Sequence, residues 1–413
     1  MKVSVLTLGC KVNQAESSSI EASLRSKGCN IVELNENPDF CIVNTCSVTS
    51  KSDYQSRQLI RRAHKAGASV IVTGCYSELN KDAVKAMDGV KMVVGNSNKN
   101  SISSKVEAEP SCITSELGSP TRSRFFLKVQ DGCNYSCSYC IIPRARGRSQ
   151  SITIDEAVEK IEALTNGYSE VVLTGIHLGT YGYDLPHKVK LSDLLSGILL
   201  KTKIGRVRLS SLEIREVDEA LLDLLKEKRV CKHLHIPLQS GDDKILAMMN
   251  RTYDSKEFLN GINMLLERFP DMSIGTDVIV GFPGETEKEF DNTYSFLENI
   301  PFSYLHVFPF SSRKGTKASE MPARVDPAIQ KRRCSLLREL GTRKKRDYML
   351  TQVGQTLDLL VEEIGENLEC LGTTGNYLKA RATLDDAHVK DIVPVRIAAI
   401  ENELVTGYPI PSR

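Results

Sequence analysis

Short apolar, β-branched runs alternate with helix-like segments through the first part of the chain. Strands that alternate with helices in this way are typical of a parallel α/β sheet. We therefore expect residues 1–110 to form an N-terminal α/β domain built on a parallel sheet. The predicted strands are residues 2–10, 38–46 and 68–75, and the predicted helices between them are residues 15–28 and 51–67.

The same alternation resumes further along the chain and predicts a second α/β domain. Residues 95–124 are rich in Ser, Asn, Gly and Pro and predict a connector. Six strand and helix units follow, which predict a partial or complete (β/α) barrel over residues 120–348. The strands are expected at residues 125–130, 170–176, 206–212, 233–239, 273–282 and 304–310, with helices that include 154–167, 218–229 and 256–270.

The pattern changes again near the C-terminus. Residues 326–350 predict a basic amphipathic helix with Leu336, Leu337 and Leu340 on its apolar side, which we interpret as a solvated linker. Short strands separated by polar turns follow, and they predict a small all-β barrel over residues 350–413 of the type that binds nucleic acids. The overall expectation is an α/β protein with three domains.

Composition and charge add little beyond an intracellular location. The chain has 413 residues and a net charge of +2, so any nucleic-acid-binding surface must be a local basic patch. No apolar run is long enough to cross a membrane, and the N-terminal residues lack the features of a signal peptide. We expect a cytoplasmic protein without a membrane partner.

Cysteine usage divides the chain's twelve cysteines into two classes. In a cytoplasmic protein most cysteines are free thiols. Cys10, Cys46 and Cys75 each follow a predicted strand, so they should converge at the carboxyl edge of the sheet, where α/β proteins bind ligands. The remaining cysteines are expected to be small hydrophobic core residues without a ligand role: Cys29, Cys41, Cys112, Cys231, Cys334 and Cys370.

Cys133, Cys137 and Cys140 form a second group with C-x3-C-x2-C spacing. Zinc sites usually use four ligands, with a second pair downstream, and no such pair follows here. Iron–sulfur clusters also use closely spaced thiolates. Three thiolates without an evident fourth would leave one iron of a four-iron cluster open. The alternative is three core or zinc thiols, which a loop rich in Gly, Asn and Ser does not favour.

This spacing, with the aromatic Tyr139 before the last cysteine, resembles the radical S-adenosylmethionine (SAM) superfamily. The resemblance implies that the open iron binds SAM and that an electron from the cluster releases a 5′-deoxyadenosyl radical. The stretches "LTGIHLG" (173–179) and "DVIVGFPGET" (277–286) resemble segments that bind SAM in this superfamily. Candidate SAM or substrate contacts are Tyr139, Thr174, Gly175, Ser211, Glu213, Gln239 and Gly281.

Together the two cysteine groups resemble the radical SAM methylthiotransferase family, over essentially the whole chain. The resemblance implies that Cys10, Cys46 and Cys75 hold a second [4Fe–4S] cluster, and that two SAM molecules are used per turnover. One would methylate a sulfur on this auxiliary cluster, and the other would yield the radical that activates a carbon. The alternative, three separate redox or structural thiols, does not explain the shared position at strand ends.

The residues around the first cysteine, "LGCKVNQ" (8–14), most resemble the branch that modifies threonylcarbamoyladenosine at position 37 of tRNA. Two other branches are alternatives: one acts on isopentenyladenosine in tRNA and one on a ribosomal-protein aspartate. A non-catalytic iron–sulfur protein that binds RNA or transfers electrons is a further alternative. The first branch implies tRNA and an electron donor of the flavodoxin or ferredoxin type as partners.

Arginines just past the second cysteine group are candidates for RNA contacts. Arg144, Arg146 and Arg148 could bind RNA phosphate or the SAM carboxylate, and solvated surface arginines are the alternative. The basic helix and the terminal barrel would supply further phosphate contacts. Affinity for tRNA should then fall steeply with salt.

Overall fold

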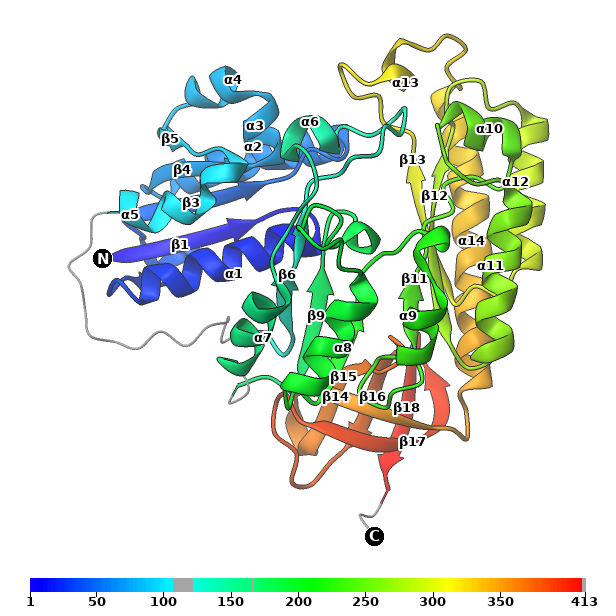
Figure 1. The fold of residues 1–413 in the computed structure, drawn as a ribbon. Coiled ribbons are helices and arrows are strands. Elements are labelled where there is room, and N and C mark those ends of the chain that lie inside the picture. The colour runs from blue at the N-terminus through cyan, green and yellow to red at the C-terminus, as the bar shows by residue number, and fades with distance from the viewer. Residues whose placement is uncertain (107–121, 165–166, 411–413) are drawn as a thin grey trace.

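The computed structural model describes residues 1–106, 122–164 and 167–410, which form three domains in contact (Figure 1). The predicted α/β class with a terminal β-barrel is confirmed. Cys112, predicted to be a core residue, lies outside the described residues. The other five cysteines expected in cores, Cys29, Cys41, Cys231, Cys334 and Cys370, are all buried.

The N-terminal domain is a five-stranded, fully parallel sheet with the strand order β2-β1-β3-β4-β5. The central strands β3 and β4 are buried on both faces, which explains their continuous apolar sequence. The strands are β1 (Lys2–Thr7), β2 (Asn30–Ile31), β3 (Phe40–Thr45), β4 (Ser69–Gly74) and β5 (Val90–Val93). The helices are α1 (Lys11–Arg25), α2 (Ser50–Lys65), α3 (Cys75–Leu79), α4 (Lys81–Lys85) and α5 (Ile102–Lys105).

The start of the predicted connector has structure of its own. Asn96–Ser101 forms a 3-10 helix that continues into α5, and Ile102 is completely buried against Val3 and Leu24. The apolar side chains of this segment complete the core of the N-terminal domain. The sequence analysis predicted a connector here because the segment is rich in Asn and Ser, and the burial of the single residue Ile102 cannot be seen in that composition.

The central domain contains all six predicted strands in sequential order. β6, β9 and β10 form one parallel sheet, and β11, β12 and β13 form another. A parallel bridge from Val207 to Val230 joins the two sheets into a partial barrel that is open between β6 and β13. The strands are β6 (Phe125–Lys128), β9 (Glu170–Thr174), β10 (Arg206–Leu209), β11 (His233–His235), β12 (Ser273–Val280) and β13 (Tyr304–Pro309).

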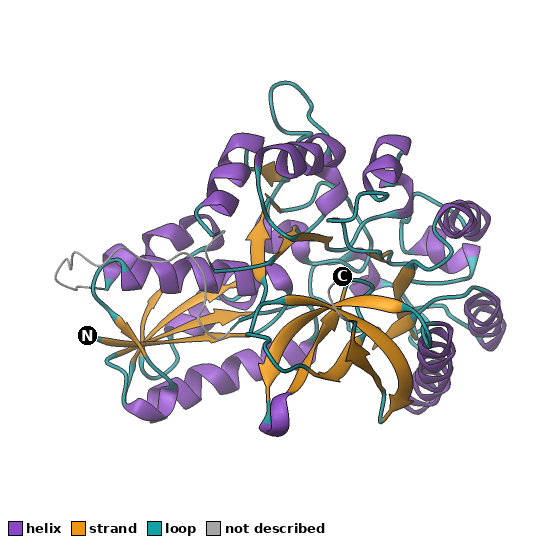
Figure 2. Ribbon diagram, turned by 90° about the horizontal axis from the view of Figure 1, so that it is seen from below, coloured by secondary structure: helices purple, strands orange, loops and turns teal. Residues whose placement is uncertain are grey.

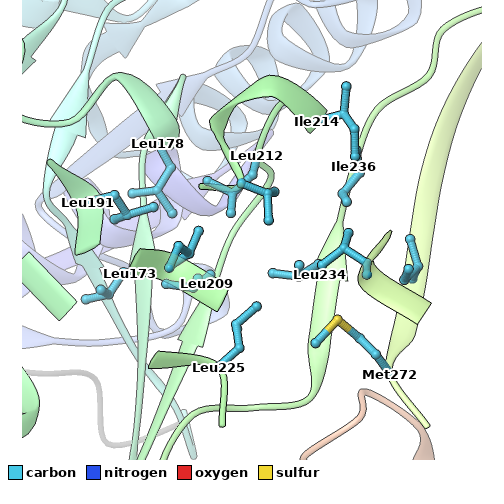
Figure 3. Close-up of a cluster of buried hydrophobic side chains, with 14 of the residues drawn as sticks. Leu173, Leu178, Leu191, Leu209, Leu212, Ile214, Leu225, Leu234, Ile236 and Met272 are labelled. Atoms are coloured by element: carbon cyan, nitrogen blue, oxygen red, sulfur yellow. The ribbon is translucent and has the colours of Figure 1, made fainter. Parts of the chain in front are cut away.

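Helices follow the strands and cover the outside of the partial barrel. Their apolar faces pack on alternate strand residues such as Leu173, Leu209 and Leu234, which Figure 3 shows as one continuous cluster. The opposite faces of the strands point into the barrel. The helices are α6 (Ile142–Arg146), α7 (Ile154–Glu162), α8 (Leu191–Lys201), α9 (Glu219–Leu224), α10 (Asp243–Met248), α11 (Ser255–Arg268), α12 (Glu287–Asn299) and α13 (Lys317–Glu320), with a small hairpin of β7 (Gln130–Asp131) and β8 (Gln150–Ser151).

The predicted basic helix is α14 (Pro327–Thr351), which packs along β13 and closes one side of the barrel (Figure 1). Leu337 and Leu340 are buried as predicted, but Leu336 is 37% exposed. Arg333 is buried and paired with Glu285, so the helix is a packed part of the domain and not a solvated linker. The sequence prediction was wrong on this point because charged residues can pair inside an interface.

The terminal barrel closes five strands in the order β14-β15-β16-β18-β17, and Figure 2 shows it from below. It sits on the amino-terminal ends of the central strands. There Arg206 and Arg208 share the buried carboxylate of Glu170 and donate hydrogen bonds to carbonyls of the terminal barrel. The strands are β14 (Thr356–Ile364), β15 (Glu369–Thr374), β16 (Lys379–Thr383), β17 (Ile392–Glu401) and β18 (Leu404–Pro409).

No helix among the described residues is both long and apolar enough to pass through a lipid bilayer.

Candidate metal centres

The first cysteine group is assembled by three neighbouring strands. Cys10 follows β1 and is the N-cap residue of α1, Cys46 follows β3, and Cys75 follows β4 as the first residue of α3. These strands are adjacent in the sheet, so the three side chains meet at its carboxyl edge, close enough to influence one another electrostatically. The predicted convergence is therefore present.

Two glycines allow this close approach. Gly9 has a φ of +112°, and a Cβ there would lie 3.0 Å from Sγ of Cys46. Gly74 has a φ of +101°, and a Cβ there would lie 2.3 Å from the carbonyl oxygen of Thr45. A side chain at either position would push the cysteine loops apart, and the left-handed conformation itself disfavours one.

Two of the three thiols of this group, those of Cys46 and Cys75, are buried. Burial raises the pKa of both Cys46 and Cys75. These thiols must lose their protons to bind iron, since thiolate is the species that ligates iron. Cys10 is the exposed member, so the group faces outward from the sheet edge.

The second group lies on the loop between β7 and α6. The amide of Cys140 donates to the carbonyl of Cys137 at 3.0 Å, and the amide of Cys133 donates to the carbonyl of Gly147 at 3.1 Å. Burial raises the pKa of Cys137, and that of Cys140 to about 12. Nη1 of Arg251 lies 3.5 Å from Sγ of Cys137, which places a positive charge beside this ligand candidate.

His177 is a neighbour of this group to which sequence reasoning assigned no role. Its Nδ1 lies 3.5 Å from Sγ of Cys133, and its Nε2 lies 2.5 Å from Glu216. Burial lowers its pKa, but the contacts with Cys133 and Glu216 outweigh this and raise the pKa to about 10. The only sequence signal was its position after a strand whose end was already expected to bind SAM.

The predicted SAM contacts fall into three kinds of environment. Tyr139 and Gln239 line a cavity together with Cys140, and Val48 and Thr49 of the N-terminal domain form its other wall. Thr174 is buried and its hydroxyl has no hydrogen-bond partner among the described residues. Their roles stay predictions.

The remaining predicted contacts already have protein partners. Ser211 lies 2.8 Å from Nδ1 of His235, and Glu213 pairs with Arg251. The amide of Gly281 donates to the Glu285 carboxylate at 3.1 Å. Gly175 lies close to Gln130, where a Cβ would come within 2.8 Å of Oε1.

These features fit iron–sulfur clusters and SAM. Each group offers three thiols from one edge and lacks a fourth cysteine within the described residues. At the end of the barrel next to the second group, the hydroxyls of Thr174 and Ser210 are buried and have no hydrogen-bond partner in the described part of the chain. Buried polar atoms are normally hydrogen-bonded, so these unpaired hydroxyls indicate a polar ligand.

Known proteins resemble the chain in both regions. Residues 127–297 match the radical SAM superfamily, and residues 2–95 match the uncharacterized protein family UPF0004. The threonylcarbamoyladenosine tRNA methylthiotransferase MtaB of Aquifex aeolicus is 37% identical over 399 residues, covering 92% of this chain and 96% of the relative. The tRNA-2-methylthio-N(6)-dimethylallyladenosine synthase of Campylobacter curvus is 33% identical over 429 residues, covering 98% of each.

The chain belongs to the radical SAM methylthiotransferase family. A solved structure with a similar fold is the radical SAM methyltransferase TsrM of Kitasatospora setae with cobalamin and a [4Fe–4S] cluster bound. Its TM-score is 0.56 at 14% identity, with 77% of each chain covered. That likeness concerns the fold alone.

In this methylthiotransferase, a buried charge network joins the domains that carry the two cysteine groups. Glu16 of α1 pairs with Lys99, Lys128 and Arg146, and Arg146 also pairs with Asp131 beside the second group. Burial raises the pKa of Glu16, but its cationic neighbours outweigh this and hold the pKa well below the usual range. The network therefore sets where the N-terminal domain sits against the barrel.

Arg146 belongs to this network and does not face solvent. Its side chain is completely buried, donates to Asn13 at 2.6 Å and contacts Cys75. It therefore does not present its guanidinium to an RNA in this structure, contrary to what its place among three arginines suggested. Arg144 and Arg148 are exposed, and their RNA contacts stay predictions.

A second set of polar contacts joins the N-terminal domain to the loop that follows β13. Arg313, in the loop after β13, pairs with Asp53 and donates to Oγ of Ser47 at 3.1 Å. The amide of Ser50 donates to Oγ of Ser311 at 2.9 Å. Ser47 directly follows Cys46, so this tie holds the loop of one cysteine group against the barrel of the other.

Proposed function

We propose that the protein adds a methylthio group to C2 of N6-threonylcarbamoyladenosine at position 37 of tRNA. The observation that carries the proposal is a cavity walled by both domains: Cys140 of the second group lines it, and so do Val48 and Thr49, which follow Cys46 of the first group. A reaction that brings a sulfur from one centre to a carbon activated at another needs such a shared space.

Each cysteine group has a separate task in this proposal. Cys133, Cys137 and Cys140 would hold the [4Fe–4S] cluster that binds SAM, and Cys10, Cys46 and Cys75 would hold an auxiliary [4Fe–4S] cluster. When bound, these groups and two SAM molecules per turnover supply the electron, the radical, the methyl group and the sulfur. A flavodoxin- or ferredoxin-type donor would provide electrons.

The protein's own residues position and shield these groups. Thr174, Gln239 and Tyr139 would orient SAM at the end of the barrel. Val48 and Thr49 form the wall of this cavity on the side of the N-terminal domain. The ties through Arg146 and Arg313 hold the two groups at a constant separation.

We further propose that tRNA is held by contacts outside the cavity. Arg144 and Arg148 are exposed beside the second cysteine group, and α14 and the terminal barrel would supply further phosphate contacts. Raising salt should therefore weaken tRNA binding steeply, because bound counterions are released from the RNA. The proposed location is the cytoplasm.

The test is an anaerobic reaction of the iron-reconstituted protein with SAM, reductant and tRNA, followed by mass spectrometry of the nucleosides. Threonylcarbamoyl-modified tRNA should yield the methylthio product. A product only with isopentenyladenosine-modified tRNA, or only with a ribosomal protein, would replace the substrate and keep the chemistry. Absence of any methylthio product while iron is bound would leave a non-catalytic iron–sulfur protein.

A further inference from the structure

The inner face of the partial barrel is polar and aromatic, unlike its apolar outer face. Along β9, Val171 and Leu173 pack outward into the core, while Glu170 and Thr174 lie on the opposite face. β11, β12 and β13 repeat this alternation. The inward residues of the last three strands include His233, His235, Asp277, Tyr304 and His306.

The carboxylates of this inner face already have their cationic or histidine partners. Glu170 is shared by Arg206 and Arg208. Oδ1 of Asp277 lies 3.0 Å from His235 and 3.1 Å from His306, and these contacts hold the pKa of Asp277 well below its usual range against the opposing effect of burial. Both Glu170 and Asp277 are therefore already paired, and neither forms an ion pair with a further cation in the described part of the chain.

Lys11 is a basic residue at this inner face that has no carboxylate partner of its own among the described residues. It directly follows Cys10, and its Nζ lies 5.5 Å from the ring centroid of Tyr377, which stacks on His233 inside the barrel. Arg208 and Glu170 act on it electrostatically. Among the described residues, no carboxylate or carbonyl oxygen accepts a hydrogen bond from Nζ of Lys11.

Other polar atoms on the inner face also lack partners. Nδ1 of His233 and the hydroxyl of Ser210 are buried without hydrogen bonds among the described residues. Lys11 has no carboxylate partner of its own, because Glu170 is already shared by Arg206 and Arg208. An unpaired cation beside unpaired buried hydrogen-bonding atoms is complementary to a small anionic group with further polar atoms.

We propose that Lys11 binds the carboxylate of the threonylcarbamoyl arm inside the barrel. This rests on the proposed function, and it makes the inner face the specificity site for the amino-acid part of the substrate. The adenine would lie near Cys10, and the arm would follow the Lys11 side chain into the barrel. His233 would then be placed to hydrogen-bond the polar atoms of the arm.

The test measures equilibrium binding of two stem-loop RNAs to the reconstituted protein. One carries threonylcarbamoyladenosine at the modified position, and the other carries its neutral methyl ester. The wild type should bind the acid about 10- to 100-fold more tightly than the ester, the range of one lost charge-assisted hydrogen bond. Lys11→Met should lose this preference by weakening only the acid, and Lys11→Arg should keep most of it.

Lys51→Met is the matched control, because Lys51 is an exposed lysine of the same domain. It should change the binding of acid and ester equally or not at all. An unchanged acid-to-ester ratio in Lys11→Met, or no ratio in the wild type, overturns the assignment of Lys11. Unchanged ester binding shows that the variant is folded. Failure of the wild type to methylthiolate the acid stem-loop would overturn the proposed function instead.

Discussion

The two cysteine groups place three thiols each by different means. Cys133, Cys137 and Cys140 lie within eight residues of one loop, whose own hydrogen bonds set their spacing. Cys10, Cys46 and Cys75 are brought together only when three strands pair in the right register. The Cys133 group depends on one loop and the Cys10 group on the pairing of three strands, so damage to the fold should affect the Cys10 group first.

The largest expected effects separate the tasks of the groups. Cys137→Ala should abolish 5′-deoxyadenosine formation, because the SAM-binding cluster loses a ligand. Cys46→Ala should preserve deoxyadenosine formation and abolish sulfur insertion. Mass spectrometry of both products, with iron counted per chain, checks this. Sulfur insertion by Cys46→Ala would contradict the two-cluster assignment.

The next largest effect tests the charge network of Glu16, which joins the domains that carry the two cysteine groups. Glu16→Gln should destabilise the protein by about 3–5 kcal/mol, because buried Lys99 and Arg146 lose their shared carboxylate. Urea unfolding measures this, and the Cys10 group should lose iron before the Cys133 group. Glu21→Gln on the same helix, where the carboxylate lies 4.0 Å from partly exposed Arg25 in an i,i+4 pair, should cost much less.

The stability that the Glu16 network contributes should depend on pH in one direction. The pKa of Glu16 is lowered on folding, so its stabilisation is present above the unfolded pKa. It is lost only as the pH falls through the lower folded value. Wild-type stability should therefore fall on acidification more steeply than that of Glu16→Gln. Equal slopes for the two proteins would mean that Glu16 is not charged in this network.

A smaller effect should be confined to the local site. His177→Phe removes the ring nitrogen beside Cys133 and should slow deoxyadenosine formation by about 10-fold, since a charge-assisted contact to a ligand sulfur is lost. The electron paramagnetic resonance signal of this cluster should change, and that of the other should not. His187→Phe, at an exposed position, is the control and should change neither.

The smallest effect compares ligand candidates with packing thiols. Cys41 is completely buried in β3, a few residues before Cys46, and burial raises its pKa to about 12. Cys41→Ala should lower the free energy of unfolding by about 1 kcal/mol, as for deletion of one buried heavy atom. Its iron content should equal that of the wild type. Loss of a cluster's iron would add Cys41 to the ligand set.

Much of the architecture could be predicted from the sequence, because periodicity is a local property. The six central strands, the three strands that precede the first cysteine group and the terminal barrel all agree with their hydrophobic patterns. The expectation that Cys10, Cys46 and Cys75 meet followed from the rule that parallel strands share a carboxyl edge. The helical turn at Asn96–Ser101 was missed, since its burial depends on distant residues.

The sequence by itself determined the two cysteine groups and the family, because spacing and order are written along the chain. Only the tertiary structure decided which charged side chains form ion pairs with one another. Arg146 and Arg148 are two residues apart, yet one is buried against Glu16 and Cys75 and the other is exposed. Nothing in the sequence distinguishes Lys11 from other lysines, and only the fold places it beside Tyr377. Electrostatic pairing depends on distance in space, which a linear pattern does not contain.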